Sequence, residues 1–286
     1  MKIAKNQFLT LIVPGGLLLI FGLVVPLVYF FRFSFMEPSI TSFAEPGISV
    51  QNFVTIASNP YYVGVFVRTL VMAFVATVIT LVLSLPVALH LSRSRGLRKN
   101  LLVVLALFPL LIGSVVRSIG WLALFGYTGL LNGLLGTLGW QDTPQNFSQN
   151  VYSVTLALGI LLVPICILVL TSTLESLDPS VERAAHDLGA RPTRVFYQIL
   201  VPQMVPGILA ATSLVFVLNM NAYATPLLVG GPGVQMMATQ MYSTMVAGNN
   251  WPLGAAMAVV LVVTSLGAIS IYSLFVRTQL LKWKSR

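Results

Sequence analysis

Thr69 to Leu91 reads TLVMAFVATVITLVLSLPVALHL and contains no Asp, Glu, Lys or Arg. A helix of about 20 such residues crosses the hydrocarbon core of a bilayer. Five further stretches have a similar length and character: Phe8–Phe31, Leu101–Leu124, Val151–Leu174, Met204–Leu228 and Pro252–Phe275. The third of the six spans is the least regular, because Arg117 interrupts it. The sequence therefore predicts an all-α membrane protein with six transmembrane helices.

The composition excludes most other classes of protein. Of the 286 residues, 57% are hydrophobic and only 8% are charged, whereas soluble domains carry roughly 25% charged residues. The net charge of +9 comes from basic residues between the apolar stretches, which does not form the basic face that nucleic acid requires. Cys166 is the only cysteine, so neither a disulfide framework nor a thiolate metal site is available. The first stretch exceeds the roughly 7 to 15 apolar residues of a cleavable signal, so we expect a retained helix.

The distribution of Lys and Arg predicts the orientation in the membrane, because these residues collect in cytoplasmic loops. Six spans place both termini on one side, and we expect residues 1–286 to form a single transmembrane domain. That side would hold 13 of the 16 basic residues, namely Lys2, Lys5, Arg93, Arg95, Arg98, Lys99, Arg183, Arg191, Arg194, Arg277, Lys282, Lys284 and Arg286. The other three, Arg32, Arg68 and Arg117, lie near the outer ends of predicted spans and can reach the head groups. Both termini are therefore predicted to be cytoplasmic.

The loop between the fourth and fifth spans, residues 176–202, carries helix signals. Asp178 suits the N-cap, Pro179 the first helical position, and Glu182 the first turn, where the helix dipole favours a negative charge. An apolar face with small central residues follows at helical spacing: Val181, Ala184, Ala185 and Leu188. Gly189 is expected to end this helix, and Arg191 before a proline favours a bend into a second short helix. The segment is either an amphipathic helix on the membrane surface or a docking surface for another protein.

Segment 176–202 resembles the cytoplasmic motif of the inner-membrane permeases of ABC importers, which reads Glu-Ala-Ala, three residues, Gly, nine residues, Ile-x-Leu-Pro. The matching residues are Ala184, Ala185, Gly189, Ile199 and Pro202. Arg183 stands where the motif has Glu, and Val201 where it has Leu. Glu182, one residue earlier, is a substitute for the acidic position. The resemblance implies a type I (MetI-like) ABC importer permease fold.

Three further patches are similar to the permeases of polyamine importers and their relatives for opines and aminoethylphosphonate: residues 109–121, 129–132 and 250–256. The resemblance implies that segment 176–202 couples the spans to an ATPase through Glu182, Arg183, Ala184, Ala185, Asp187 and Gly189. It implies as partners a second homologous permease, two ATP-binding subunits, an extracytoplasmic substrate-binding protein and membrane lipid, but no nucleic acid. ATP and magnesium would bind the partner subunits, and this chain would hold no cofactor.

Candidate residues for a substrate path gather in the fifth span, which is the most polar: Asn219, Asn221, Tyr223 and Thr225. These side chains either line the path or form hydrogen bonds between helices. Asn219 and Asn221 are two apart and do not share a helix face. Arg117 is a further candidate for the path, with snorkelling or the capping of a backbone carbonyl as the alternative.

The sequence offers no enzymatic or metal site. His90 and His186 have no third ligand nearby in the sequence, and the chain has no Gly-x-x-x-x-Gly-Lys-Ser/Thr motif for holding ATP. We therefore expect a transport subunit, not an enzyme, that moves a small polar solute such as a polyamine. The alternative is an ion-coupled secondary transporter, although the predicted spans lack the acidic residue that such coupling normally uses.

Overall fold

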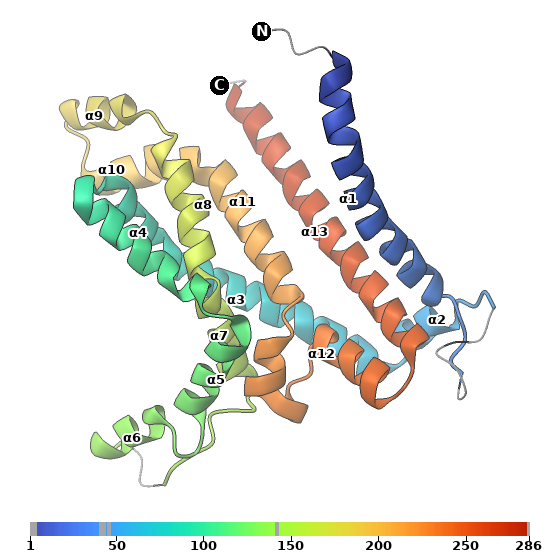
Figure 1. Ribbon diagram of the computed structural model, residues 1–286. Helices are drawn as coiled ribbons and strands as arrows, with labels where there is room; N and C mark the ends of the chain where they lie inside the picture. The colour runs from blue at the N-terminus through green and yellow to red at the C-terminus, as the bar shows by residue number, and fades with distance from the viewer. Residues whose placement is uncertain (1–4, 40–43, 45–46, 141–142, 285–286) are drawn as a thin grey trace. The chain divides into compact units, whose positions relative to one another are not determined.

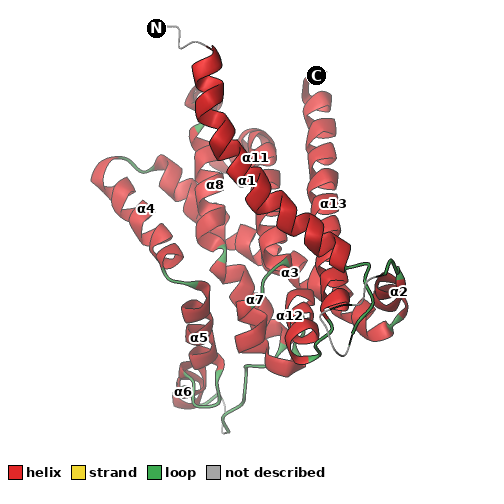
Figure 2. Cartoon of the chain, turned by 45° about the vertical axis from the view of Figure 1, so that its right-hand side comes forward, coloured by secondary structure: helices red, strands yellow, loops and turns green. Residues whose placement is uncertain are grey.

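The computed structural model describes residues 5–39, 44, 47–140 and 143–284, and helices dominate these residues (Figure 2). The α-helices, labelled in Figure 1, are α1 (Lys5–Phe33), α2 (Gln51–Ser58), α3 (Pro60–Arg93), α4 (Gly96–Leu111), α5 (Ser114–Phe125), α6 (Leu130–Thr137), α7 (Val151–Leu161), α8 (Val163–Glu175), α9 (Pro179–Asp187), α10 (Pro192–Val195), α11 (Val201–Met220), α12 (Met237–Tyr242) and α13 (Trp251–Lys284). The described residues also form shorter helical turns. Three are π-helical, namely η1 (Phe196–Leu200), η2 (Pro226–Gly230) and η4 (Ser243–Ala247), and one is a 3-10 turn, η3 (Gly231–Gly233).

The described helices are long and apolar enough for a multi-pass membrane protein. Five stretches meet that condition: Val13–Phe33, Pro60–Arg93, Ser114–Thr137, Pro192–Met220 and Trp251–Leu274. Helices α7 and α8 together form a sixth span if the pair, bent by 41°, is counted as one. The all-α class is therefore confirmed, and the number of spans agrees with the prediction.

The prediction of a continuous third span over residues 101–124 is wrong. Helix α4 ends at Leu111 and α5 starts at Ser114, because Ile112 (φ −87°, ψ 125°) and Gly113 (φ −56°, ψ 147°) are extended. Pro109 lies in the last turn of α4 and offers no N–H to the helix. The fifth span, predicted over residues 204–228, both starts and ends earlier, since α10, η1 and α11 follow one another without a gap from Pro192 to Met220 and Asn221 is the C-cap residue.

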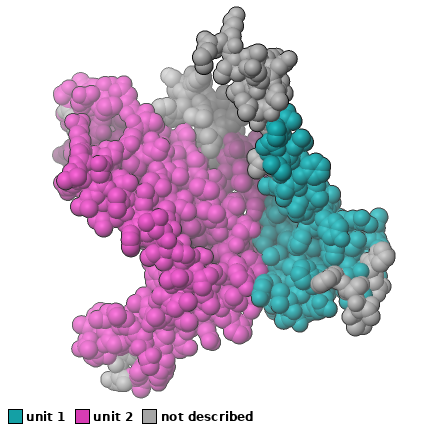
Figure 3. Space-filling model, in the orientation of Figure 1, with its two compact units in different colours: residues 1–64, 240–262 teal, residues 65–239, 263–286 magenta. Residues whose placement is uncertain are grey.

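The chain divides into two compact units, residues 1–64 with 240–262 and residues 65–239 with 263–286 (Figure 3). In the first unit, a buried asparagine joins α2 to the turn after α1. The Asn52 amide donates to the carbonyls of Ser34, at 3.1 Å, and Met36, at 2.8 Å. The Tyr61 hydroxyl at the start of α3 donates to the Gln240 side chain in α12 at 2.7 Å. These polar contacts connect the helices of this unit.

In the second unit, α3 is held to α7 and α8 through a stripe of small and hydroxyl residues. The Thr80 hydroxyl donates to the carbonyl of Gly159 in α7 at 2.6 Å, and the Ser84 hydroxyl donates to the carbonyl of Val163 at 3.2 Å. A Cβ atom on Gly159 would lie 2.8 Å from the Ile79 side chain. Glycine at this position therefore permits the close approach of the two helices, as small residues do between membrane helices.

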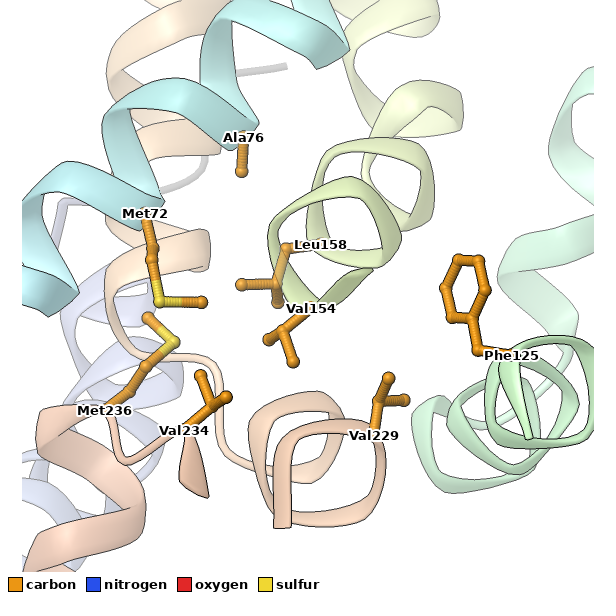
Figure 4. Packing of buried hydrophobic residues seen from close by; sticks show 8 residues of the cluster. All are labelled: Met72, Ala76, Phe125, Val154, Leu158, Val229, Val234 and Met236. Atoms are coloured by element: carbon orange, nitrogen blue, oxygen red, sulfur yellow. The ribbon is translucent and has the colours of Figure 1, made fainter. Parts of the chain in front are cut away.

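Two apolar clusters form the core of the second unit. The first, drawn in Figure 4, packs Met72 and Ala76 of α3 against α5, α7 and the segment after α11, and its members are Met72, Ala76, Phe125, Val154, Leu158, Val229, Val234 and Met236. The second joins α3, α8, η1 and α11 through Ala88, Cys166, Leu170, Leu200, Met204, Ala211 and Val215. Within this unit α9 and α10 lie at one end and α6 lies at the opposite end (Figure 1).

Candidate functional site

The start of α9 confirms the predicted cap. The Asp178 carboxylate accepts a hydrogen bond from the backbone N–H of Ser180 at 2.8 Å, and Pro179 and Glu182 occupy the first helical position and the first turn. The backbone amide of Ser180, followed by its side chain, lowers the pKa of Asp178 because both stabilise the ionised carboxylate. The local sequence therefore fixes where this helix begins.

The end of α9 also confirms the predicted turn, with one correction beyond it. Gly189 has φ +81°, and Arg191 is extended at φ −64°, ψ 144°. The Ala190 N–H bonds the carbonyl of Ala185 at 3.0 Å. The predicted second short helix is not a separate element, since α10 is four residues long and continues through η1 into α11. The turn at Gly189 therefore connects α9 directly to a span.

Helix α9 presents an apolar surface that this chain leaves uncovered. Leu188 is 88% exposed and Val181 is 42% exposed, Ala184 is exposed, and Ala185 is half-buried. A Cβ atom on Gly189 would meet no atom within 4 Å. A large exposed apolar residue beside small ones on one helix is typical of a surface that another protein covers.

The charged residues of α9 differ in their surroundings. Arg183 and Asp187 are exposed, and the Arg183 side chain donates to the carbonyl of Pro179 at 3.3 Å within its own helix. Glu182 is turned toward α3, where its carboxylate lies 2.6 Å from the Arg93 guanidinium. The six residues predicted to couple this segment to an ATPase thus lie on one short helix and its turn, and Glu182 has a partner in the chain itself.

Four of the five candidate path residues line a cavity of about 480 Å³ at the end of α11. Its lining includes Arg117, Asn219, Tyr223 and Thr225, together with mainly aliphatic side chains from α5, α7 and α11. Asn221 does not line it: this exposed amide donates to the carbonyl of Val217 at 2.8 Å and contacts the Ser265 hydroxyl at 3.3 Å. The structure therefore confirms that Asn219 and Asn221 lie on different faces.

Asn219 is the most unusual polar residue of the cavity. It is 0% exposed, and neither its amide nitrogen nor its carbonyl oxygen has a hydrogen-bond partner. An unpaired amide in an apolar setting costs roughly 1 to 3 kcal/mol, so a buried asparagine of this kind calls for an explanation. Thr225, in contrast, is paired with the buried Ser118 hydroxyl at 2.9 Å, a residue that the sequence reasoning did not include.

Arg117 caps a backbone carbonyl where a span is broken. Its Nη1 donates to the carbonyl of Leu161 at 3.0 Å, the last residue of α7, and Pro164 follows in the first turn of α8. The Nε atom of Arg117 is buried without a partner. The three predicted roles of Arg117 were the substrate path, snorkelling and the capping of a backbone carbonyl. The structure shows the carbonyl cap, and the Arg117 side chain also borders the cavity. The position of Pro164 was the available signal for this break.

A second cavity, of about 650 Å³, is also bordered by Arg117 and Leu161. Its lining comes from α3, α4, α5, α7 and α8, and Arg117 is its only charged residue. No three His, Cys, Asp or Glu side chains gather into a metal site in the part of the chain that the structure describes. The candidate site thus consists of a short exposed helix at one end and a weakly polar cavity within the second unit.

The described residues form a multi-pass class of helical membrane protein, with an exposed short helix between two spans. The sequence matches the family model of the binding-protein-dependent transport system inner membrane component over residues 61–279, and the chain belongs to this family. It is 30% identical over 273 residues, covering 95% of both chains, to the spermidine/putrescine transport system permease protein PotB of Haemophilus influenzae.

Two other similarities extend the comparison. A putative 2-aminoethylphosphonate transport system permease protein, PhnU of Salmonella choleraesuis, is 28% identical, with 88% of both chains covered. The fold is similar to that in a crystal structure of a bacterial ABC transporter involved in the import of the acidic polysaccharide alginate, with a TM-score of 0.78, 14% identity and 96% of both chains covered. The fold is thus that of a type I ABC importer permease.

Proposed function

We propose that this chain is the transmembrane permease subunit of a binding-protein-dependent ABC importer that moves a polyamine across the bacterial inner membrane. The observation that carries the proposal is α9, a capped short helix whose apolar and small residues face outward between two spans. Family membership and the similarity to a spermidine/putrescine permease support the same function. The polyamine itself is inferred from the relatives.

The proposed assembly contains a second, similar permease, two ATP-binding subunits and an extracytoplasmic substrate-binding protein. The exposed face of α9 and its turn contains Val181, Ala184 and Leu188. This face would lie in a groove of an ATP-binding subunit. ATP and magnesium would bind there, and movement of that subunit would reach the spans as a rigid-body displacement. Gly189, with its positive φ, would keep α9 at a fixed angle to α11.

The proposed path passes the cavity of about 480 Å³ beside Asn219 and Tyr223. No acidic residue lines this cavity, so capture of a polyamine would be left to the binding protein, and the path would offer dipoles and an aromatic face. Asn219 is the strongest candidate because its amide is buried and unpaired. Asn221 would serve helix packing instead, through the Ser265 contact.

The proposed orientation places both termini and α9 in the cytoplasm. The basic residues Arg93, Arg95, Arg98 and Lys99 lie around the same end of the second unit as α9, as the contact between Arg93 and Glu182 requires. Reporter fusions at Arg95 and Asp187 should therefore report cytoplasm, and a fusion at Met236 should report the outer side. Lys2, Glu45, Asp142 and Arg286, which belong to the same topology prediction, lie outside the described residues.

Uptake measurements test the proposed function. Cells lacking their own polyamine importers should take up radiolabelled spermidine or putrescine when this chain is expressed with its partner subunits, and 2-aminoethylphosphonate serves as a competing solute. The matched control expresses all other subunits without this chain. Uptake by proteoliposomes that contain the chain alone would instead establish the ion-coupled transporter, and uptake that 2-aminoethylphosphonate abolishes would reassign the substrate.

A further inference from the structure

An ion pair links the short helix α9 to the end of a distant span. The Arg93 Nη2 atom lies 2.6 Å from the Glu182 Oε1 atom, although 89 residues separate the two in sequence. Arg93 is the last residue of α3, and Glu182 is in the first turn of α9. The pair therefore connects the proposed docking helix to a span that is not its neighbour along the chain.

A second ion pair ties the same region together. Lys99 Nζ, in the first turn of α4, lies 2.7 Å from the carboxylate of Glu175, the last residue of α8. The link between α8 and α9 thus has an ion pair at each end. Glu175 at the end of α8 contacts Lys99, and Glu182 in the first turn of α9 contacts Arg93. Both basic partners come from the hairpin between α3 and α4, so this hairpin holds the link at two points.

The contact between α9 and α3 combines the ion pair with a partly apolar hollow. A small hollow of about 130 Å³ lies between them, lined by residues that include Ser92, Arg93, Val181 and Glu182. The side chain of Arg93 is 61% exposed and that of Glu182 is 28% exposed. Exposed ion pairs contribute little to folding stability, and what this pair does in the structure is to place the first turn of α9 beside the end of α3. When a partner subunit covers α9 and excludes water, the attraction strengthens.

We infer that Arg93 and Glu182 form a positioning pair through which displacement of α9 moves the end of α3. Displacement of α9 then reaches the spans by two routes, through Gly189 and α10 into α11 and through the ion pair into α3. Glu182 acts within the chain, and the exposed Arg183 and Asp187 are left as charged residues of α9 available to a partner subunit. This inference rests on the proposed function, because it assigns a route to the movement that an ATPase would impose.

Charge reversal in the assembled complex tests the pair. We expect Arg93→Glu and Glu182→Arg each to raise the ATP hydrolysed per solute imported by about two- to fivefold, as expected for loss of a partly exposed ion pair. The double variant with both changes should return close to the wild-type ratio, because the charges attract again in reversed order. Arg95→Glu is the matched control, since Arg95 is exposed in the same hairpin and has no ion-pair partner among the described residues.

A second measurement does not depend on the solute. Ser92→Cys places a thiol beside the hollow, and the native Cys166 is buried, so maleimide labelling reports the end of α3. Addition of ATP should change the labelling rate in the wild-type and double-variant backgrounds but not in either single variant. Copurification with the ATPase shows that each complex assembles, and Arg93→Gln and Glu182→Gln are milder substitutes if a reversal prevents assembly.

The inference is overturned if the double variant is as impaired as the single variants, or if Arg95→Glu has the same effect as Arg93→Glu. An ATP response in labelling that survives both single variants also overturns it. Absence of solute uptake by the wild-type complex would count against the proposed function alone, because the labelling measurement would still report on the ion pair.

Discussion

Substitutions of Gly189 distinguish two reasons for a glycine at the turn after α9. One is the positive φ of the turn, and the other is close packing of a partner ATPase against it. Its φ of +81° is a conformation that costs residues with a Cβ roughly 1 to 2 kcal/mol. A Cβ atom would meet nothing within 4 Å in this chain, so steric conflict with neighbouring residues contributes nothing. Because 1.4 kcal/mol corresponds to about tenfold in an equilibrium, Gly189→Val should reduce the population with a correctly placed α9 by about 5- to 30-fold.

The comparison with Gly189→Asn and Gly189→Ala identifies which reason applies. Asparagine accepts positive φ far more readily than valine, so Gly189→Asn should retain most uptake if conformation alone matters, and Gly189→Ala should be intermediate. If the partner ATPase packs against this turn, all three variants should lose uptake and ATPase copurification together. Radiolabelled uptake, with the membrane level of each variant measured by immunoblot, gives the answer. Normal uptake by Gly189→Val would refute both reasons.

Three further predictions follow from the packing and the caps. Asn219→Leu should slow uptake severalfold while thermal stability in detergent stays equal or rises, because it removes an unpaired buried amide; a loss of stability instead would show a structural role. Gly207→Val should lower stability by about 1 to 3 kcal/mol, because its side chain would collide with Thr173, whereas Gly120→Ala, with open space around it, is the control with little effect. The lowered pKa of Asp178 means that its cap stabilises α9 fully above the ordinary value of 3.8 and is lost as the pH falls through the lower native value. At any one pH between 6 and 8, tryptic cleavage at Arg183 should therefore proceed at the same rate in the wild type and in Asp178→Asn, and faster in Asp178→Ala; equal rates in all three would contradict the cap.

The sequence predicted the elements whose signals are local. Asp178, Pro179 and Gly189 determined the two ends of α9 because caps and positive φ depend on a few adjacent residues. The apolar runs predicted most of the spans because crossing the bilayer requires about 20 consecutive apolar residues, which can be counted in the sequence. The break at Ile112 and Gly113 was not predicted, because membrane helices tolerate proline and glycine when neighbouring helices satisfy the freed backbone groups. Whether Pro109 bends a helix or ends it depends on packing that the sequence does not contain.

The sequence predicted which residues belong to the candidate site, but it did not predict what each of their side chains contacts. Spacing placed Asn219 and Asn221 on different faces, yet only the structure distinguishes the buried unpaired amide from the exposed one that contacts Ser265. The contact between Arg93 and Glu182 joins residues 89 apart, and no local pattern indicates such a pair. Arg117 likewise finds its partner carbonyl in Leu161, on a helix whose break creates the unpaired acceptor.

The bend between α7 and α8 divides one span between two packing groups. Val154 and Leu158 of α7 belong to the cluster around Met72 and Val229, whereas Cys166 and Leu170 of α8 belong to the cluster around Met204. Leu161 and Leu162 lie at the junction between the two groups. Helix α3 crosses this junction without a break, since it contributes Met72 and Ala76 to one group and Ala88 to the other, so the bent span is packed along its whole length against an unbroken one.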